Sequence, residues 1–286
     1  MIHDSIYTRY QPGVTPETQT DENAIWFLFM GDKLLVSGEN SQARIPTALQ
    51  LEQWGIALPQ PLYLGTLDGR ACYAAELDNS VALSPEVRAE PLRTLFGRME
   101  DGVFLLAGRA LQILNWHGAN RFCGRCGSKT GDKTDERAKL CPNCGAVVYP
   151  KLSPAIIVAV ERENSLLLAH AAHFSNNIYS VISGYVEPGE TLEDCVRREL
   201  REEVQIEAKN IRYFGSQPWP YTDSLMIAFT AEYAGGEIQV DGQEIETAGW
   251  YTVEELRSLN IPNPISVSRS LIEWFIKKHG NDNLNK

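Results

Sequence analysis

The stretch RELREEVQI, residues 198–206, places five charged side chains in its first six positions. Apolar residues recur at a spacing of four in and before this stretch, which predicts an amphipathic helix over about residues 191–204. At about 100° per residue, Glu199, Glu202 and Glu203 share one face of that helix. Three carboxylates on one face repel one another, so we expect a positive partner there.

Two kinds of partner fit this acidic face. Arg197, Arg198 and Arg201 could neutralise a solvated face through salt bridges along the helix. A hard divalent cation is the alternative, because Mg²⁺ and Mn²⁺ prefer carboxylate oxygens and bridge them to phosphates. The preceding loop ISGYVEPGE, residues 182–190, favours the cation. Its glycines flank a proline, and such a loop can deliver a backbone carbonyl and the Glu190 carboxylate to the same cluster.

The composition describes a folded chain with an acidic surface. Its 286 residues, 43% of them hydrophobic, can bury a sizeable core, and the length favours about two domains. No run approaches the roughly 20 apolar residues of a membrane span, and the start lacks the pattern of a signal peptide. We therefore expect a soluble, cytoplasmic protein. The formal charge of −11 opposes nonspecific attraction to nucleic acid or anionic membrane, although a local basic pocket could still exist.

Strand and helix patterns alternate along the chain, which predicts an α/β or α+β fold. Residues 1 to about 115 read as β-rich, with hairpins around Gly31–Asp32 and Asp68–Gly69, and a helix is expected at 104–122. The capping-box spacing of Thr252 and Glu255 marks a later helix start. Further strands are expected at 155–160, 165–172, 226–235 and 235–240, and further helices at 252–259 and 265–278.

Four of the six cysteines form two C-x2-C pairs separated by 14 residues: Cys123, Cys126, Cys141 and Cys144. This spacing closes a tetrahedral Zn²⁺ shell of four thiolates, so the zinc is expected to be structural. Buried free cysteines or a redox pair are the alternative reading. The segment between the pairs carries four basic and three acidic residues, which is too balanced for a strong phosphate-binding surface. Cys72 and Cys195 stand alone, as reduced thiols do in a cytoplasm.

From Gly184 to Ile206 the sequence resembles the Nudix box, G-x5-E-x7-R-E-U-x-E-E-x-G-U, where U is apolar. Only Gln205 departs, at a glycine position suited to a left-handed residue that ends the helix. That conformation costs another residue roughly 1 kcal/mol, so Gln205 must accept the strain or end the helix differently. The fitting residues are Gly184, Glu190, Arg198, Glu199, Leu200, Glu202, Glu203 and Ile206.

The resemblance implies an α/β/α sandwich whose box glutamates hold the divalent metals that activate water against a pyrophosphate. Glu199 and Glu203 would bind Mg²⁺ or Mn²⁺, and Glu202 would support or share a metal. The backbone carbonyl of Ser183 would be a further ligand. Glu244 would supply a third carboxylate, although a simple polar turn is the alternative at that position.

Further roles follow from the same resemblance. Arg198 would orient a box carboxylate, which we expect to be Glu190. Contacts with the substrate are implied for Glu136 and Tyr149, and also for Ser268 and Arg93.

The segment SQPWPYTDSLM, residues 216–226, resembles the SQPWPFPxS motif of the NADH pyrophosphatase branch. Trp219 and Tyr221 could stack on a flat base or a nicotinamide ring, or they could be buried in a loop. Thr222–Asp223 replaces Pro-x, and the loss of that proline leaves the loop less rigid. The expected substrate contacts are Gln217, Pro218, Trp219, Pro220, Tyr221, Thr222, Asp223 and Ser224.

The order of parts also resembles that branch: a β-rich amino-terminal domain at 1–118, a zinc ribbon at 119–150 and a Nudix domain at 151–286. The resemblance implies hydrolysis of NADH or NAD⁺ to nicotinamide mononucleotide and AMP, and removal of an NAD cap from RNA breaks the same bond. It also implies a homodimer. A Nudix hydrolase acting on ADP-ribose or dinucleoside polyphosphates is the nearest alternative. An inactive zinc-ribbon binding or regulatory protein is the other, which three intact glutamates oppose.

Overall fold

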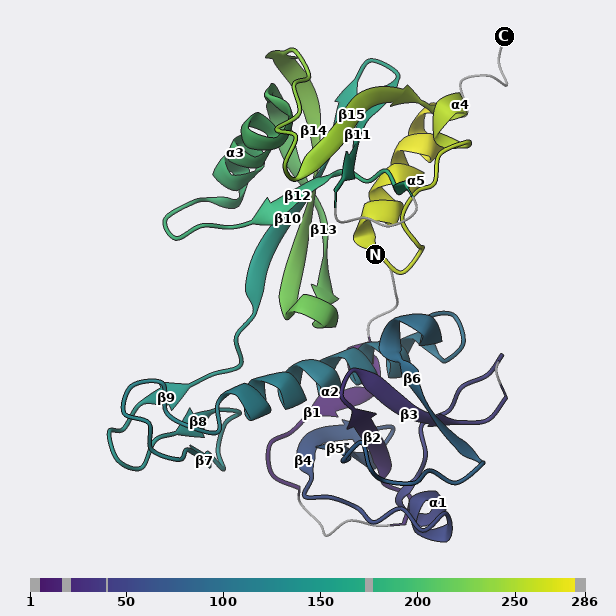
Figure 1. Ribbon diagram of the computed structural model, residues 1–286, viewed down its shortest axis with the longest axis vertical. Helices are drawn as coiled ribbons and strands as arrows, with labels where there is room; N and C mark the ends of the chain where they lie inside the picture. Colours follow the sequence, from purple (N-terminus) through teal and green to yellow (C-terminus); the bar gives the residue numbers. More distant parts are fainter. Residues whose placement is uncertain (1–5, 17–21, 40, 173–176, 281–286) are drawn as a thin grey trace. The chain divides into compact units, whose positions relative to one another are not determined.

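The computed structural model describes residues 6–16, 22–39, 41–172 and 177–280, and it divides into two compact units (Figure 1). One unit spans His3–Lys151, and the other takes the chain from Leu152 onward. Among the described residues, no helix is both long enough and apolar enough to cross a membrane.

The first unit is built on a six-stranded sheet of order β1-β4-β5-β2-β3-β6. Both predicted hairpins are present, β2–β3 and β4–β5, and the second turns at Asp68 and Gly69, whose φ angles of 51° and 75° suit a two-residue hairpin loop. The elements are η1 (Ile6–Thr8), β1 (Tyr10–Pro12), β2 (Ile25–Met30), β3 (Lys33–Ser37), α1 (Ala48–Gln53), β4 (Leu62–Leu67), β5 (Arg70–Glu76), β6 (Val87–Pro91), η2 (Leu92–Leu95) and α2 (Asp101–Ala119).

Helix α2 packs against β5 and β2 and begins three residues before the predicted start. A small antiparallel sheet follows it, formed by β7 (Gly131–Asp132), β8 (Lys139–Leu140) and β9 (Val147–Val148). Each strand has two residues, so backbone pairing alone gives this region little stability.

The second unit contains a mixed sheet of order β13-β14-β10-β11-β15, with β12 paired to β10. Its central pair, β10 and β14, runs parallel over nine residue pairs. The elements are β10 (Ser153–Arg162), β11 (Ser165–Ala171), β12 (Ile182–Tyr185), α3 (Leu192–Val204), β13 (Ile206–Trp219), η4 (Pro220–Thr222), β14 (Ser224–Gly236), β15 (Ile245–Thr252), α4 (Val253–Leu256) and α5 (Val267–His279).

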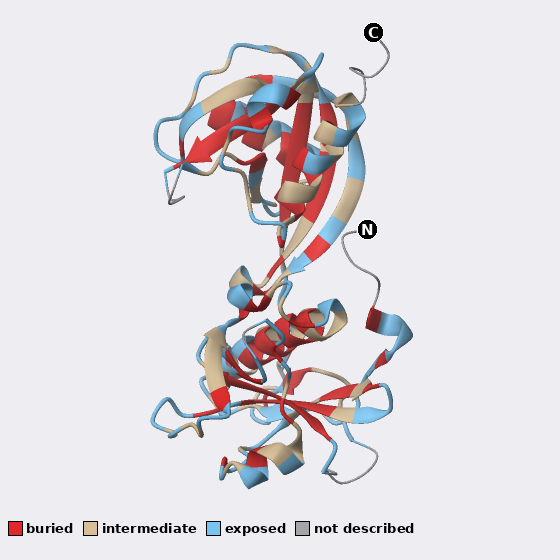
Figure 2. Ribbon diagram, turned by 90° about the vertical axis from the view of Figure 1, so that its right-hand side faces the viewer, coloured by how far each residue is buried: buried red, intermediate tan, exposed pale blue. Residues whose placement is uncertain are grey.

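Helices cover both faces of this sheet, which gives the predicted α/β/α sandwich. On β10, Ile156 and Val158 pack in the core that includes Leu200 of α3. The intervening Ile157 packs in the core that includes Leu271 of α5. Side chains alternate between the faces because a strand repeats every two residues. Figure 1 shows α3 and α5 on opposite sides of the strands, and Figure 2 shows strands of this unit coloured as buried.

One predicted strand is wrong. Residues 235–240 were expected to form a strand, but only Gly235 and Gly236 belong to one, at the end of β14. Residues 237–240 run as a loop along the end of α3, where the N–H of Gln239 donates to the carbonyl of Val204 at 3.1 Å. The Thr252–Glu255 capping box is confirmed, although α4 ends after one turn.

Candidate functional site

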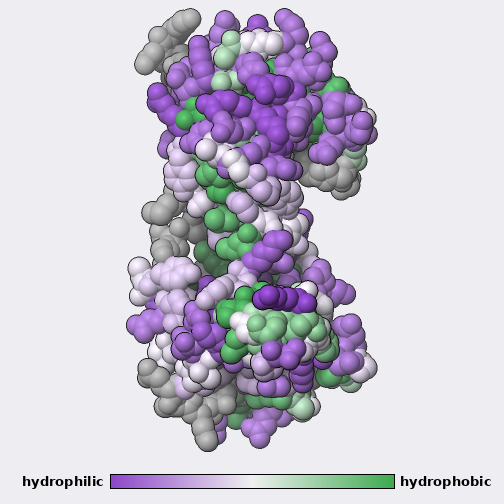
Figure 3. Space-filling model, turned by 90° about the vertical axis from the view of Figure 1, so that its left-hand side faces the viewer, coloured by the Kyte–Doolittle hydropathy of each residue, from purple (hydrophilic) through white to green (hydrophobic). Residues whose placement is uncertain are grey.

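Helix α3 carries the three glutamates of the acidic face. Thr191 caps its first turn by accepting a hydrogen bond from the N–H of Asp194 at 3.1 Å. The apolar side of the helix faces the sheet, and this turns Glu199 and Glu203 inward, with exposed fractions of 8% and 7%. Glu202 keeps 59% of its side chain exposed. Figure 3 looks onto the side of this unit where α3 lies, and hydrophilic residues dominate that face.

Strand β12 opens the loop of residues 182–190, which we call the box loop, and brings it against Glu199. A Cβ atom on Gly184 would lie 1.9 Å from the carboxyl carbon of Glu199, so only glycine leaves room for that carboxylate. Gly184 is fixed in the sheet opposite Ile156 of β10. The exposed Ser183 precedes it on the same strand, so its backbone lies one residue from this close approach.

Arg198 ties the box carboxylates together. Its guanidinium donates to both carboxylate oxygens of Glu190, at 2.6 and 3.0 Å, and to Glu199 and Glu202, at 2.8 and 2.9 Å. It also donates to the carbonyl of Tyr185 at 2.9 Å. The bond from Arg198 is the main reason that the pKa of Glu190 falls to about 2. Glu190 therefore lies with Arg198, as expected.

Glu203 lies in the most acidic surroundings. Burial, followed by the charges of Glu199, Glu244 and Asp241, raises the pKa of its carboxyl to about 8. Burial also raises the pKa of Glu199. A cation beside these carboxylates would favour their charged forms. This all-oxygen donor set fits a hard divalent cation.

Asp241 shapes the loop that presents Glu244, and sequence analysis missed it. Its carboxylate accepts from the N–H groups of Glu244 and Ile245, at 3.0 and 2.9 Å. Its own N–H lies 3.3 Å from the carbonyl of Glu203. The Asp-Gly pair at 241–242 is a turn signal that could have revealed this arrangement.

Gln205 accepts the strained conformation. It caps α3 with φ 56° and ψ 34°, in the left-handed region, and its N–H bonds back to the carbonyl of Arg201 at 3.2 Å. Gly236 lies so close that a Cβ atom there would be 2.5 Å from the Gln205 carbonyl oxygen. The helix therefore ends where the family's glycine would end it.

The expected substrate motif forms a tight turn between β13 and β14. The rings of Trp219 and Tyr221 meet edge to face, with centroids 5.0 Å apart, and both residues are half-buried. Asp223 adopts a left-handed φ of 51°, and its carbonyl accepts from the N–H of Ser153 at 2.9 Å. Thr222 and Pro218 are exposed, whereas Pro220 is buried.

Hydroxyl groups hold this turn. The buried Ser224 has its Oγ 2.9 Å from Thr222 Oγ1 and 3.2 Å from the hydroxyl of Tyr185. Tyr185 belongs to the box loop, so this bond connects the loop beside the glutamates to the turn of Trp219. Sequence analysis passed over Tyr185, because a tyrosine in a loop gives no signal of its partner.

Two predicted contact residues form hydrogen bonds inside the second unit. The buried Gln217 donates to the carbonyl of Ile265 at 2.7 Å and accepts from the N–H of Val267 at 2.8 Å, which holds the start of α5. The buried Ser268 places its hydroxyl 2.7 Å from that of Ser180. The structure therefore gives both side chains partners within the protein.

Three further predicted contacts belong to the first unit. The hydroxyl of Tyr149 donates to Glu136 at 3.2 Å, and Glu136 also bonds Lys133. Arg93 is exposed on η2.

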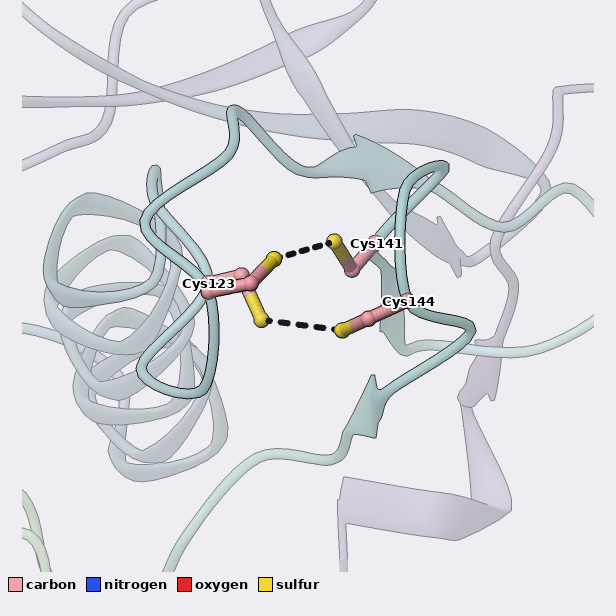
Figure 4. A group of neighbouring side chains, drawn as sticks. Cys123, Cys141 and Cys144 are labelled. Atoms are coloured by element: carbon pink, nitrogen blue, oxygen red, sulfur yellow. Dashed lines mark hydrogen bonds between the residues drawn. The ribbon is translucent and has the colours of Figure 1, made fainter.

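The four predicted zinc ligands converge. Their sulfur atoms all lie within 4.8 Å of one another, with Cys123 to Cys144 at 3.6 Å and Cys126 to Cys141 at 3.4 Å. Tetrahedral Zn²⁺ with Zn–S bonds of about 2.3 Å needs sulfur atoms about 3.8 Å apart. Figure 4 shows the thiols pointing toward one centre from the two knuckles. The geometry fits a four-thiolate zinc site.

The chain is similar to several known proteins. The NAD-capped RNA hydrolase NudC of Chromobacterium violaceum is 41% identical over 249 residues, which cover 86% of this chain and 89% of that protein. The NAD-capped RNA hydrolase NudC of Stutzerimonas stutzeri is 44% identical over 215 residues, 75% of this chain and 77% of that protein. A crystal structure of a Nudix hydrolase from Nitrosomonas europaea is 20% identical, with a TM-score of 0.45, over 56% of this chain and 93% of that one.

Family models match three consecutive parts of the chain. An NADH pyrophosphatase-like rudimentary NUDIX domain matches 23–116, an NADH pyrophosphatase zinc ribbon domain matches 119–149, and a NUDIX domain matches 151–275. The chain belongs to the Nudix hydrolases of the NADH pyrophosphatase type.

In this Nudix hydrolase the four cysteines belong to a zinc ribbon, which supports the predicted Zn²⁺. The predicted fold class is confirmed as well, with a β-rich part, a ribbon and a Nudix sandwich in that order. The division into domains at 118 and 150 stays a prediction, and the ribbon lies in the same compact unit as the β-rich part.

Proposed function

We propose that this Nudix hydrolase cleaves the pyrophosphate bond of NADH and NAD⁺, and of an NAD cap on RNA. Water adds across the bond, giving nicotinamide mononucleotide with AMP, or with an RNA that keeps a 5′-monophosphate. The observation that carries the proposal is the buried pair Glu199 and Glu203 on the box helix. The names of the relatives support the substrate, since both are NAD-capped RNA hydrolases.

The carboxylates of Glu199, Glu203 and Glu244, with the backbone carbonyl of Ser183, would hold the divalent cation, Mg²⁺ or Mn²⁺. When bound, such an ion polarises phosphoryl oxygens and lowers the pKa of a water molecule. Arg198 keeps Glu199 in place, because its guanidinium spans the box carboxylates. The exposed Glu202 supports the cluster from its outer edge.

The turn at 217–224 would bind the flat part of the dinucleotide. Trp219 and Tyr221 offer half-buried ring faces of the size that stacks on nicotinamide or adenine. The bond from Tyr185 to Ser224 supports this role, because it fixes the turn relative to the box loop.

Contacts from Glu136, Tyr149 and Arg93 belong to the proposal as well, as does a homodimer. Weaker support remains for direct contacts by Gln217 and Ser268, since both side chains have partners inside the protein. A cytoplasmic location is part of the same proposal.

A metal-dependent assay of NADH hydrolysis that measures released AMP tests the site. We expect Glu203→Gln to lower turnover at least about a hundredfold, because it removes a charged ligand from the metal cluster. Glu193→Gln is the matched control, an exposed glutamate on the first turn of the same helix. Wild-type turnover by Glu203→Gln would exclude the metal assignment.

The substrate needs a separate comparison. We expect kcat/KM to be higher for NADH and NAD-capped RNA than for ADP-ribose or diadenosine polyphosphates. Preference for either of the latter two would keep the Nudix chemistry and reject the proposed substrate. An absence of turnover on all of them would favour the inactive binding protein.

A further inference from the structure

The amino-terminal unit contains a cavity of about 490 Å³ that the proposed hydrolysis does not use. Its volume falls within the range of roughly 300–1,000 Å³ common for small-molecule sites. Two acidic residues line it, Asp68 and Glu100. Four arginines from separate segments line it too: Arg9, Arg44, Arg70 and Arg98. The lining therefore carries a positive excess in a chain with a formal charge of −11.

Arg9 pairs with both acidic residues. It pairs with Asp68 at 2.6 Å and with Glu100, so one guanidinium lies between two carboxylates. The hydrogen bond from Arg9 holds the pKa of Asp68 below its usual value. Both acids therefore already have a partner, and the arginines of the lining still outnumber its acids.

Arg44 and Arg70 bond only neutral acceptors in the contacts of the described chain. Arg70 donates to the carbonyl oxygen of Asn23 at 2.9 and 2.8 Å, and Arg44 donates to the side-chain oxygen of Gln42 at 3.0 Å. Neither forms an ion pair with any described residue, and both are exposed. Arg98, by contrast, pairs with a carboxylate, Glu90, at 2.5 Å.

The floor of the cavity is apolar. Ile25, Leu67 and Met99 line it, and their exposed fractions are 7%, 3% and 8%. A ligand that suits this cavity has an anionic group for the exposed arginines and a flat, weakly polar group for the apolar floor. A nucleotide has both, and the planar fork of arginine matches phosphate oxygens.

We propose that this cavity binds a nucleotide, with Arg44 and Arg70 contacting its phosphate. The phosphate could come from the body of an RNA substrate or from a free mononucleotide. The RNA source rests on the proposed removal of NAD caps. Contacts of this kind add affinity without reading sequence, because they use the backbone charge.

The test uses the full chain and the double variant Arg44→Gln/Arg70→Gln, without added divalent cation. Fluorescence anisotropy measures binding of a labelled ten-nucleotide RNA that has a 5′-hydroxyl and therefore no pyrophosphate to cleave. Calorimetry measures binding of cytidine 5′-monophosphate. We expect the variant to weaken RNA binding at least about fivefold and to reduce the salt slope by about 1.4, since two contacts with a single strand are lost.

The matched control is Arg212→Gln/Arg257→Gln, which makes the same change in net charge at two exposed arginines of the other unit. We expect RNA binding by the control and NADH turnover by both variants to stay near wild type. Because the probe is not a substrate, failure of hydrolysis and failure of this site are distinguishable. If the double variant loses binding of the mononucleotide alone, the site is supported and its phosphate comes from a free nucleotide. Unchanged binding of both probes, or equal loss in the control, would overturn the proposal.

Discussion

Gln205 shows how one residue can depart from a family pattern without moving the site. Its left-handed conformation ends α3 directly after the glutamates, where glycine would end it at a lower conformational cost. We expect Gln205→Gly to raise the free energy of unfolding by about 1 kcal/mol, because glycine adopts positive φ without the Cβ clash. NADH turnover should stay within about twofold, since Gln205 supplies no ligand. Urea unfolding and the AMP assay measure the two effects.

The variant Gln205→Ala is the control for that change. Alanine also carries a Cβ atom and should give no gain in stability. Equal stabilisation by both variants would mean that the side chain of Gln205, and not its backbone conformation, is unfavourable. A tenfold rise in turnover for Gln205→Gly would show that the departure matters for function.

At the level of elements, hydroxyl bonds hold the turn that the family fixes with proline. Thr222–Asp223 stands at the proline position, and the chain from Thr222 through Ser224 to Tyr185 anchors the turn to the box loop. We expect Tyr185→Phe to raise the KM for NADH about threefold to tenfold, because one hydrogen bond to the turn is lost. The kcat should stay within about twofold of the wild-type value. Steady-state kinetics with saturating metal measure both constants.

The control for that prediction is Tyr213→Phe. Tyr213 lies on β13, is exposed, and loses a similar hydroxyl bond, to Ser216 at 3.3 Å. It should leave both constants unchanged. A large fall in kcat with unchanged KM for Tyr185→Phe would assign the tyrosine to the metal cluster instead of the turn.

Elements that carry a local signal were predictable, and those set by distant contacts were not. The helix of the box follows from its own period and cap, and its boundaries agree with the structure within one residue. The apolar pattern of residues 235–240 also suits a strand, but the loop instead bonds the end of α3. Strand β13 escaped prediction because its burial does not alternate and its pairing contains register shifts.

The same limit applies to the candidate site. Spacing placed Glu199, Glu202 and Glu203 on one face, but it could not show that the sheet buries only two of them. Family resemblance suggested Ser268 and Gln217 as contacts, and only the fold reveals their internal partners. A local sequence pattern does not show which distant residue a side chain will bond in the folded protein.

For the whole molecule, net charge describes an average and conceals local fields. A chain with a formal charge of −11 forms both a carboxylate cluster on α3 and a cavity lined by four arginines. We propose opposite ligands for these two features, a divalent cation for the carboxylates and a phosphate for the arginines. Their separation along the chain would let one acidic protein attract both.

We expect the zinc ribbon to depend on metal for its fold, because its three strands have only two residues each. We expect the wild type to contain one zinc per chain and Cys123→Ser to lose it, since three thiolates leave the shell open. Metal analysis measures the zinc content, and thermal unfolding should show a lower Tm for the variant. Cys72→Ser is the control, because this buried cysteine lies outside the cluster and should leave the zinc content unchanged. Retention of one zinc by Cys123→Ser would contradict the four-thiolate site, and zinc loss without earlier melting would show that the ribbon folds without metal.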